Sequence, residues 1–388
     1  MSEKRGFDVV VVGGGVIGLS CAWRLAQAGA RVAVLERGAP GGGATRVAAG
    51  MLAPVGELTF GEPELLELTL AAARLYPEFV AELEAATGAS TGYERLGALH
   101  VALDRDEAAQ LRRVHDLQRS LELEAEWLPP RRCRDLEPGL TPSFHGGVLA
   151  AGEAAIDPRA LTEVLLAACV AEGVEVRTGT EVVDGVFDGE RLAGLRTAKG
   201  HYDTHTVSNR PLDEEIAAEA VVLAGGAWSG AMAWLPEEAR PAVRPVKGQA
   251  VELRSRNGEP PARHILASER VYLVPRPDGR LVVGATVEEM GFDTAVTAGG
   301  VHELLREAYR LLPDVAEMEW VGATAGLRPG TPDNLPLVGP GAIDGLVLAT
   351  GHYRNGILLA PLAAQTVADL VSNRRSSLVP RTGNQGRT

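Results

Sequence analysis

Three glycines near the N-terminus have the spacing that brings a protein backbone against a dinucleotide. Gly13, Gly15 and Gly18 follow the G-x-G-x-x-G pattern. The first glycine allows a tight turn, the second admits a pyrophosphate close to the backbone, and the third lets a helix pack on a strand. Glu36 follows 18 residues after Gly18, near the spacing of about 20 residues at which an acid binds ribose hydroxyls. A carboxylate there repels a 2′-phosphate, so NADP is not expected.

A second group of residues could hold an organic acid. Arg328 lies in an Ala-Gly-Leu-Arg-Pro stretch, and a guanidinium binds a carboxylate through two parallel charge-assisted hydrogen bonds. Tyr272 lies in an apolar segment, and Arg354 lies in a Gly-His-Tyr-Arg-Asn-Gly stretch before a helical pattern. By residue type alone, an exposed arginine and a core tyrosine are the commoner interpretations. These three residues are therefore candidates only.

Several function classes are not expected. The net charge of −13 disfavours nucleic acid and anionic membrane surfaces. The three cysteines have no paired spacing, which argues against a disulfide framework and a zinc site and fits a reducing cytoplasm. His264, His302, His201 and His205 lack partners at metal spacing, and no nucleophile-elbow motif occurs. No apolar run approaches the roughly 20 residues of a membrane span, and the glycines of the N-terminal apolar run argue against a signal peptide.

The elements that position the glycine motif can be predicted from the pattern around it. Residues 9–12 predict a buried strand, residues 17–28 a helix, and residues 31–35 a second parallel strand, with Gly29 ending the helix. Residues 158–172 predict another helix. Further strands are expected at residues 174–177, 180–183, 220–223 and 345–350, and a last helix from about residue 357. The polar residues 199–215 are expected to form a surface excursion.

The choice between FAD and NAD depends on the chain beyond Glu36. It does not continue as a regular alternation of helices and strands, but passes through the small-residue stretch 41–51. Small residues allow close backbone contact with a large ligand. An extended cofactor held by distant segments favours FAD, although the glycine motif itself does not exclude NAD.

These patterns predict an α/β protein with a Rossmann-like FAD-binding domain and a second domain built on a mainly antiparallel sheet. The FAD-binding domain is expected to be discontinuous, over residues 1–84, 151–229 and 326–372. The substrate domain is expected over residues 85–150 and 230–325, where alternating segments such as 271–274 and 281–284 suit an antiparallel sheet. The polar tail 373–388 is expected to be disordered.

Five stretches together carry a family resemblance: residues 13–36, 44–54, 224–228, 322–340 and 351–355. The chain resembles the D-amino-acid oxidase superfamily of FAD-dependent oxidoreductases, and in particular the glycine oxidases of thiazole synthesis. The resemblance covers nearly the whole chain. It implies a noncovalent FAD and oxidation of an amino acid at its α-carbon.

The resemblance also implies roles for individual residues. Arg328 would pair with the substrate carboxylate, Tyr272 would close the pocket, and Arg354 would lie beside the flavin. The backbone near Val182 would meet the adenine, and residues 352–358 would meet the flavin ring. The cofactor contacts expected from the motif and the resemblance are Gly13, Gly14, Gly15, Gly18, Glu36, Arg37, Ala44, Thr45, Ala48, Ala49, Gly50, Val182, His352, Tyr353, Arg354, Asn355, Gly356, Ile357 and Leu358.

The expected reaction is oxidative deamination of glycine, sarcosine or a small D-amino acid. The product is an imine that hydrolyses to the 2-oxo acid and ammonia, with dioxygen reduced to hydrogen peroxide, and it could feed thiazole synthesis. Arg270 and Val287 stand where glycine oxidases often carry His and Met, which leaves the pocket's size and polarity open. The alternatives are a D-amino-acid dehydrogenase, a sarcosine-oxidase-like enzyme and a catalytically silent FAD-binding subunit. A cytoplasmic homo-oligomer is expected.

Overall fold

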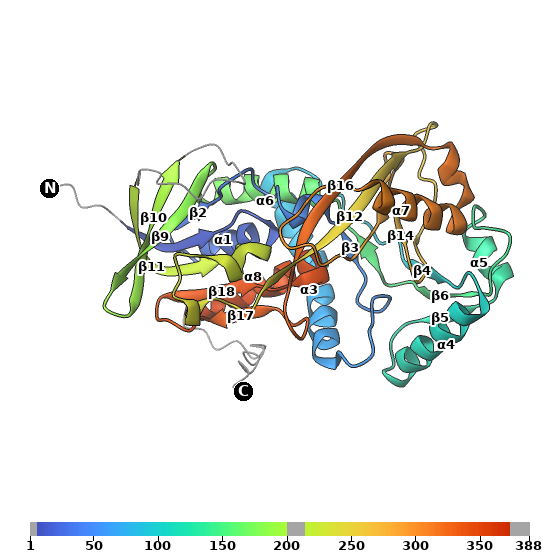
Figure 1. Ribbon diagram of the computed structural model, residues 1–388, viewed down its shortest axis with the longest axis horizontal. Helices are drawn as coiled ribbons and strands as arrows, with labels where there is room; N and C mark the ends of the chain where they lie inside the picture. Colours follow the sequence, from blue (N-terminus) through green and yellow to red (C-terminus); the bar gives the residue numbers. More distant parts are fainter. Residues whose placement is uncertain (1–5, 200–213, 373–388) are drawn as a thin grey trace.

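Two large sheets organise the molecule. The computed structural model describes residues 6–199 and 214–372, and the two sheets lie in lobes at opposite ends of the long axis (Figure 1). The expected tail 373–388, the histidines 201 and 205 and most of the expected excursion 199–215 lie outside the described residues.

The first sheet has the strand order β17-β18-β11-β1-β2-β8. Its central strands β1, β2, β11 and β18 pair in parallel, as does β8 with β2, and β17 is an antiparallel edge. Residues 9–12 of β1 are at most 5% exposed, because helices cover one face of the sheet and residues 192–195 and 232–235 cover the other. The strands are β1 (Phe7–Val12), β2 (Val32–Leu35), β8 (Glu175–Arg177), β11 (Glu214–Leu223), β17 (Leu337–Pro340) and β18 (Leu346–Thr350).

An antiparallel extension joins this sheet through β11. Strand β9 (Thr180–Asp188) pairs with β10 (Arg191–Lys199), which pairs with β11. The sequence predicted only the start of β9 and the end of β11, and it missed β10. The local signal for the β9–β10 hairpin is Gly189, which lies in the turn between Asp188 and Arg191 and has φ of +61°.

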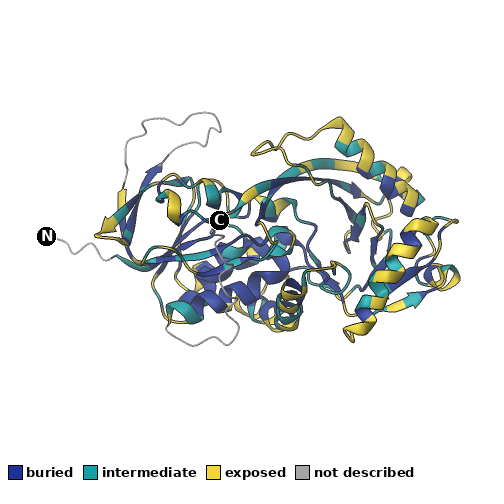
Figure 2. Ribbon diagram, turned by 60° about the horizontal axis from the view of Figure 1, so that its bottom comes forward, coloured by how far each residue is buried: buried dark blue, intermediate teal, exposed yellow. Residues whose placement is uncertain are grey.

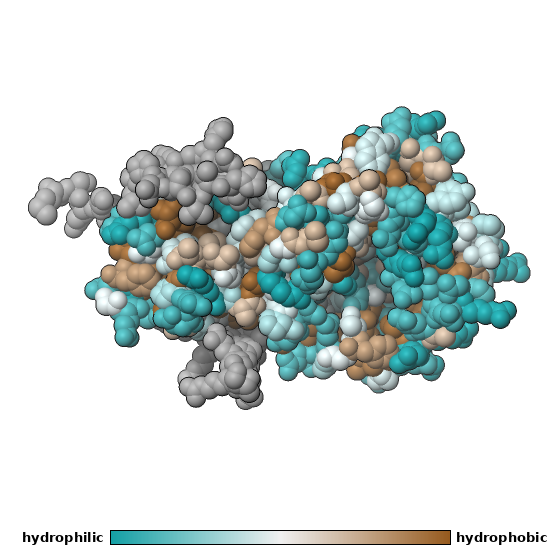
Figure 3. Space-filling view, in the orientation of Figure 1, coloured by the Kyte–Doolittle hydropathy of each residue, from teal (hydrophilic) through white to brown (hydrophobic). Residues whose placement is uncertain are grey.

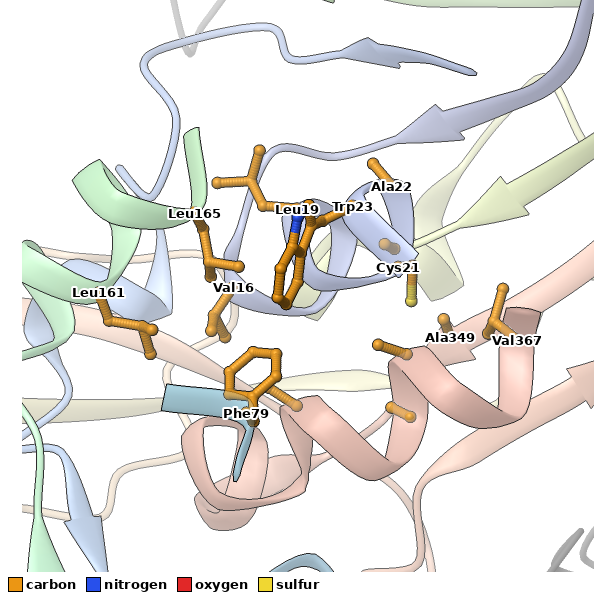
Figure 4. Close-up of a cluster of buried hydrophobic side chains, with 14 of the residues drawn as sticks. Val16, Leu19, Cys21, Ala22, Trp23, Phe79, Leu161, Leu165, Ala349 and Val367 are labelled. Carbon is orange, nitrogen blue, oxygen red and sulfur yellow. The ribbon is translucent and has the colours of Figure 1, made fainter. Parts of the chain in front are cut away.

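Four helices build the core beside the first sheet. They are α1 (Val16–Gln27), α3 (Pro63–Thr87), α6 (Pro158–Ala171) and α8 (Gly356–Val371). Trp23 of α1 meets Phe79 of α3 edge to face, with ring centroids 5.8 Å apart, and leucines of α6 surround them (Figure 4). Each such buried side chain contributes about 1.5–3 kcal/mol. Gly29 ends α1 with φ of +88°, as predicted.

The second sheet has the order β16-β12-β15-β14-β13-β4-β6-β5. All its pairs are antiparallel except β13 with β4, which confirms the predicted mainly antiparallel sheet. Helix α7 (Ala298–Leu311) covers one face through Leu304 and Leu311. The strands are β4 (Ala98–Val101), β5 (Glu126–Leu128), β6 (Gly147–Ala150), β12 (Arg244–Arg254), β13 (Ile265–Ala267), β14 (Tyr272–Pro275), β15 (Arg280–Gly284) and β16 (Glu319–Gly330).

One longer helix, α4, and several short elements complete the described chain. They are α2 (Ala44–Val47), β3 (Met51–Leu52), α4 (Arg105–Ser120), α5 (Pro130–Leu136), β7 (Ala154–Ala155), η1 (Gly226–Ala231), η2 (Glu237–Ala239), η3 (Pro313–Glu317) and η4 (Tyr353–Asn355). Buried positions follow the strands and the helix faces that cover them (Figure 2). The outer end of the second lobe, with α4 and α5, is mostly hydrophilic (Figure 3). No helix in the described ranges has the length and apolar character that a membrane crossing requires.

The predicted domain boundary between residues 325 and 326 falls inside β16. Arg328 therefore lies on the second sheet, two residues before that strand ends. The domain limits themselves stay a prediction.

Candidate active site

The glycine motif forms a tight turn between β1 and α1. Gly13 has φ of +109°, and a Cβ on it would lie 2.4 Å from the carbonyl oxygen of Ala224. A Cβ on Gly18 would lie 1.9 Å from the carbonyl oxygen of Gly13. By contrast, a Cβ on Gly15 would meet only the Thr45 hydroxyl, at 3.5 Å. The first and third glycines allow close packing, and the second leaves open space beside the helix.

The N-terminus of α1 faces this space. Gly15 is its N-cap and offers no side-chain cap, and the first turn carries no acidic residue. The Val16 amide donates to the Thr45 hydroxyl of α2 at 3.1 Å, so Thr45 lies at the helix end. Unpaired amides and the positive end of the helix dipole favour a phosphate. The turn therefore fits the pyrophosphate of a dinucleotide.

Glu36 lies at the end of β2, next to the glycine turn. Its carboxylate accepts hydrogen bonds from the Gly14 and Gly38 amides, each at 2.7 Å. The Glu36 carbonyl accepts from the Thr180 amide at 3.0 Å, which places the start of β9 beside it. Val182 is half-buried two residues further along β9. Glu36 is thus fixed where the motif predicts the ribose-binding acid.

A buried arginine supports the next part of the expected cofactor segment. The Arg276 guanidinium, 4% exposed, donates to the Ala49 carbonyl at 2.5 Å. Gly50 has φ of +72°, and its carbonyl accepts from the Ile156 amide at 2.9 Å. Residues 48–50 are therefore held from both lobes. Arg276 belongs to no sequence motif, and nothing in the pattern of the chain pointed to it.

The segment 352–358 begins helix α8. His352 is 2% exposed and its Nε2 has no hydrogen-bond partner, while burial lowers its pKa to about 3. The imidazole is thus neutral at ordinary pH, and a bound polar group would satisfy the orphaned atom. Tyr353 has φ of +45°, a left-handed conformation that aromatic residues rarely adopt and that clusters at functional sites.

The remaining predicted residues of this segment differ in burial. Ile357 and Leu358 are 6% and 2% exposed and pack in the core with α1, so they can offer mainly backbone to a ligand. Asn355 and Gly356 are half-buried at the helix start, and Arg354 is exposed.

Arg328 and Tyr272 come together on one face of the second sheet. The Arg328 guanidinium donates to the Thr286 carbonyl at 3.0 Å and hydrogen-bonds the Tyr272 phenol. Burial raises the pKa of Tyr272, and the Arg328 charge opposes that rise. Two glycines make room for them. A Cβ on Gly248 would lie 2.3 Å from the guanidinium, and a Cβ on Gly284 would lie 2.4 Å from the phenol ring.

Glu57 adds a carboxylate to this cluster. Although solvent reaches Glu57, burial by the surrounding protein raises its pKa, and the charges of Arg354 and Arg328 oppose that rise. Glu57 also lies close enough to Tyr272 to affect its pKa. The cluster therefore holds two guanidiniums, a phenol and one carboxylate. No sequence motif pointed to Glu57.

A buried acid, Glu153, holds the backbone just before Glu57. Glu153 is 2% exposed and accepts from the Val55 amide at 2.9 Å and from the Gly56 amide at 2.5 Å. Burial raises the pKa of Glu153 to about 8, and Glu57 adds to the shift. The Val55 carbonyl accepts from Gln118 at 2.9 Å. Val55 and Gly56 are thus fixed by side chains far away in sequence.

A pocket of about 170 Å³ lies between the lobes but does not include Arg328, Tyr272 or Arg354. Its polar lining is largely paired, with Arg280 on Asp157 and Arg159 on Glu252, both at 2.7 Å. It borders residues 46–48 and Arg276, so it lies behind the expected cofactor segment. Within the described part of the chain, His, Cys, Asp and Glu side chains form no cluster that could hold a metal ion.

Comparison with known proteins agrees with this geometry. Residues 8–370 match the family described as FAD dependent oxidoreductase. Glycine oxidase of Geobacillus kaustophilus is 36% identical over 378 residues, which cover 96% of this chain and 94% of that protein. A crystal structure of the same enzyme superposes with a TM-score of 0.85 over 96% of each chain.

A bifunctional ThiO/ThiG protein of Trichormus variabilis is 36% identical over 95% of this chain. The chain spans 53% of that relative's length. The family resemblance inferred from the five stretches of sequence between residues 13 and 355 is therefore confirmed, and FAD is the cofactor. The chain belongs to the family of FAD-dependent oxidoreductases.

Proposed function

We propose that this protein oxidises a small amino acid, with glycine, sarcosine and small D-amino acids as the substrate class. The product is the imine, which hydrolyses to the 2-oxo acid and ammonia, or methylamine in the case of sarcosine, and dioxygen is reduced to hydrogen peroxide. The single observation that carries the proposal is the placement of Arg328 against Tyr272 and near Glu57. The similarity to proteins named glycine oxidase supports it.

The chain's own residues would bind and orient the substrate. Arg328 is held by the Thr286 carbonyl, which leaves a preoriented guanidinium for a carboxylate. Tyr272 would close the pocket and add a hydrogen bond to the same carboxylate. Glu57 would lie near the amino end of the substrate, where a carboxylate favours an ammonium, and Arg354 would lie beside the flavin.

The cofactor would extend from the glycine turn toward residues 352–358. Gly13, Gly14, Gly15, Gly18 and Thr45 would hold the pyrophosphate, and Glu36 and Arg37 the ribose. Ala44, Ala48, Ala49 and Gly50 would line its path, with Val182 near the adenine and residues 352–358 at the flavin ring. Bound FAD supplies an acceptor for the two electrons and the hydrogen removed from the substrate α-carbon.

Three wider aspects belong to this proposal. Relatives named as bifunctional ThiO/ThiG proteins support a link of the imine to thiazole synthesis. Three buried free cysteines among the described residues fit work in a reducing cytoplasm. A homo-oligomer is proposed as well, and light scattering of the purified protein measures it.

The deciding experiment is peroxide release by the purified protein in air, with glycine, sarcosine, D-alanine, D-proline and L-alanine side by side. Turnover of glycine and sarcosine supports the proposal. Turnover of bulkier D-amino acids alone would move the enzyme to another branch of the family. Flavin bleaching without peroxide would indicate a dehydrogenase, and a silent flavin with every substrate would contradict an enzymatic role.

A further inference from the structure

Three side chains from distant parts of the chain form a stack at the edge of the glycine turn. The Trp228 ring lies against the Phe292 ring, with centroids 5.8 Å apart and planes at 25°. The Arg37 guanidinium lies over the same tryptophan, with its Cζ 4.1 Å from the ring centroid. We call Arg37, Trp228 and Phe292 the aromatic stack.

The stack borders the segment that the cofactor is expected to follow. Arg37 is the neighbour of Glu36 in sequence, and a Cβ on Gly43 would lie 3.9 Å from the Trp228 ring. Trp228 lies in η1, directly after β11, and η1 packs against β12 and β16. Trp228 therefore lies in the first lobe beside the glycine turn, a region that we call the nucleotide edge. Phe292 comes from the second lobe.

Phe292 is held in place by polar tethers. Residues 285–297 form a connection between β15 and α7 without a helix or long strand. The Lys247 ammonium, fully buried, binds Asp293 at 2.6 Å and lies 3.8 Å from Glu288. Gln249 donates to Glu288 at 2.8 Å. The residue after Phe292 is thus fixed to β12, which directs the phenyl ring toward Trp228.

The same connection and β12 also serve the substrate cluster, because the Thr286 and Lys247 carbonyls accept hydrogen bonds from Arg328, but the Phe292 ring is not part of that cluster. Phe292 is 46% exposed, although exposing a phenyl ring forgoes the stabilisation that burial would provide. The ion pair between the buried Lys247 and Asp293 holds the half-exposed Phe292 ring beside the glycine turn, which indicates a role for the ring there. We propose that Phe292 retains FAD: with Trp228 and Arg37 it closes the outer side of the dinucleotide groove and couples cofactor binding to the second lobe.

The proposal is tested by the rate of FAD release from the purified holoenzyme without substrate. Dilution into an excess of an unrelated apoprotein that binds FAD tightly traps released FAD, and the loss of bound flavin is followed by fluorescence. Phe292→Ala should release FAD roughly two- to ten-fold faster, the range that one aromatic pair supports. Phe292→Trp should restore slow release, because it preserves the stack.

Met290→Ala is the matched control, since Met290 lies in the same connection, is 56% exposed and is not in the stack. A second readout is the rise in melting temperature on adding FAD to apoprotein, which should shrink for Phe292→Ala only. Equal release rates for wild type, Phe292→Ala and Met290→Ala would overturn the proposal. So would an equal loss of stability in apo and holo Phe292→Ala protein. Both readouts are measured without an amino-acid substrate. The role of Phe292 in retaining FAD and the proposed oxidation of a small amino acid can therefore each fail without the other.

Discussion

The two lobes build their sites in different ways. At the nucleotide edge, one turn of chain between β1 and α1 supplies three glycines and a helix N-terminus, and Glu36 follows after a single helix and strand. At the substrate cluster, Glu57, Tyr272, Arg328 and Arg354 come from four separate segments. The first site depends on local backbone geometry, and the second on how sheets and connections pack. Substitutions should therefore separate cofactor retention from substrate binding.

The largest effect is expected at Gly18. Gly18→Ala places a Cβ 1.9 Å from the Gly13 carbonyl oxygen, so the backbone of the turn must move. We expect loss of bound FAD and destabilisation by about 1–3 kcal/mol, as in other overpacked sites. Flavin content after purification and urea unfolding measure both. Gly299→Ala in α7 is the control, because it has open space and should keep full FAD.

The next effect concerns Glu153, whose buried carboxylate holds the backbone of Val55 and Gly56. Its pKa rises from 4.5 to about 8 on folding, so the fold favours the protonated form. The stabilisation is fully present below about pH 4.5 and is lost as the pH rises through about 8, by a few kcal/mol. Glu153→Gln should flatten this dependence between about pH 4.5 and 8 in urea unfolding.

The exposed Glu163 on α6 gives the control for that measurement, and Glu163→Gln should leave the pH dependence of the wild type intact. The same pH dependence in Glu153→Gln and wild type would show that Glu153 does not carry it.

A substitution at Gly248 tests the substrate cluster without replacing a charged residue. A Cβ there would lie 2.3–2.5 Å from the Arg328 guanidinium, so Gly248→Ala must displace it. We expect KM for the amino acid to rise about tenfold, equivalent to roughly 1.4 kcal/mol, with FAD content unchanged. Gly322→Ala on β16 meets nothing within 4 Å and should behave as wild type. A KM that changes equally in both would exclude a specific effect on Arg328.

The smallest effect is expected at Glu57. Glu57→Gln removes the carboxylate that faces Arg354 and Arg328, which makes the cluster more positive. Substrates with a second carboxylate, such as iminodiacetate, should gain about two- to five-fold in kcat/KM relative to glycine, the range of an exposed charge pair. A matched variant, Glu62→Gln on the same connection, should keep the wild-type ratio. An unchanged ratio in Glu57→Gln would remove Glu57 from substrate selection.

The sequence predicts the nucleotide lobe well because its signals are local. The glycine spacing, the β-branched run of β1 and the position of Glu36 each depend on neighbouring residues, and the structure confirms the turn and both strands. Strand β10 was missed because its apolar residues Leu192, Ala193, Leu195 and Ala198 follow no regular alternation. Tertiary pairing with β9 and β11 decides its conformation.

The substrate lobe could be predicted only through family resemblance. Arg328 and Tyr272 were recognised in that way, since their types alone indicate a surface arginine and a core tyrosine. Glu57, Glu153 and Arg276 carry no motif, and they reach the site through packing between residues almost 100 or more positions apart. A buried acid such as Glu153 and an arginine that binds a backbone carbonyl are visible only once the chain is folded.

The most direct test of the division between the lobes is a titration of the yellow enzyme with acetate, a carboxylate that cannot be oxidised at an amine. Wild-type enzyme should show a saturable change in the flavin spectrum, and Arg328→Ala should lose it while holding FAD as tightly as wild type. The same acetate affinity in Arg328→Ala, or a loss of FAD from that variant, would contradict the assignment of carboxylate binding to Arg328 and cofactor binding to the other lobe.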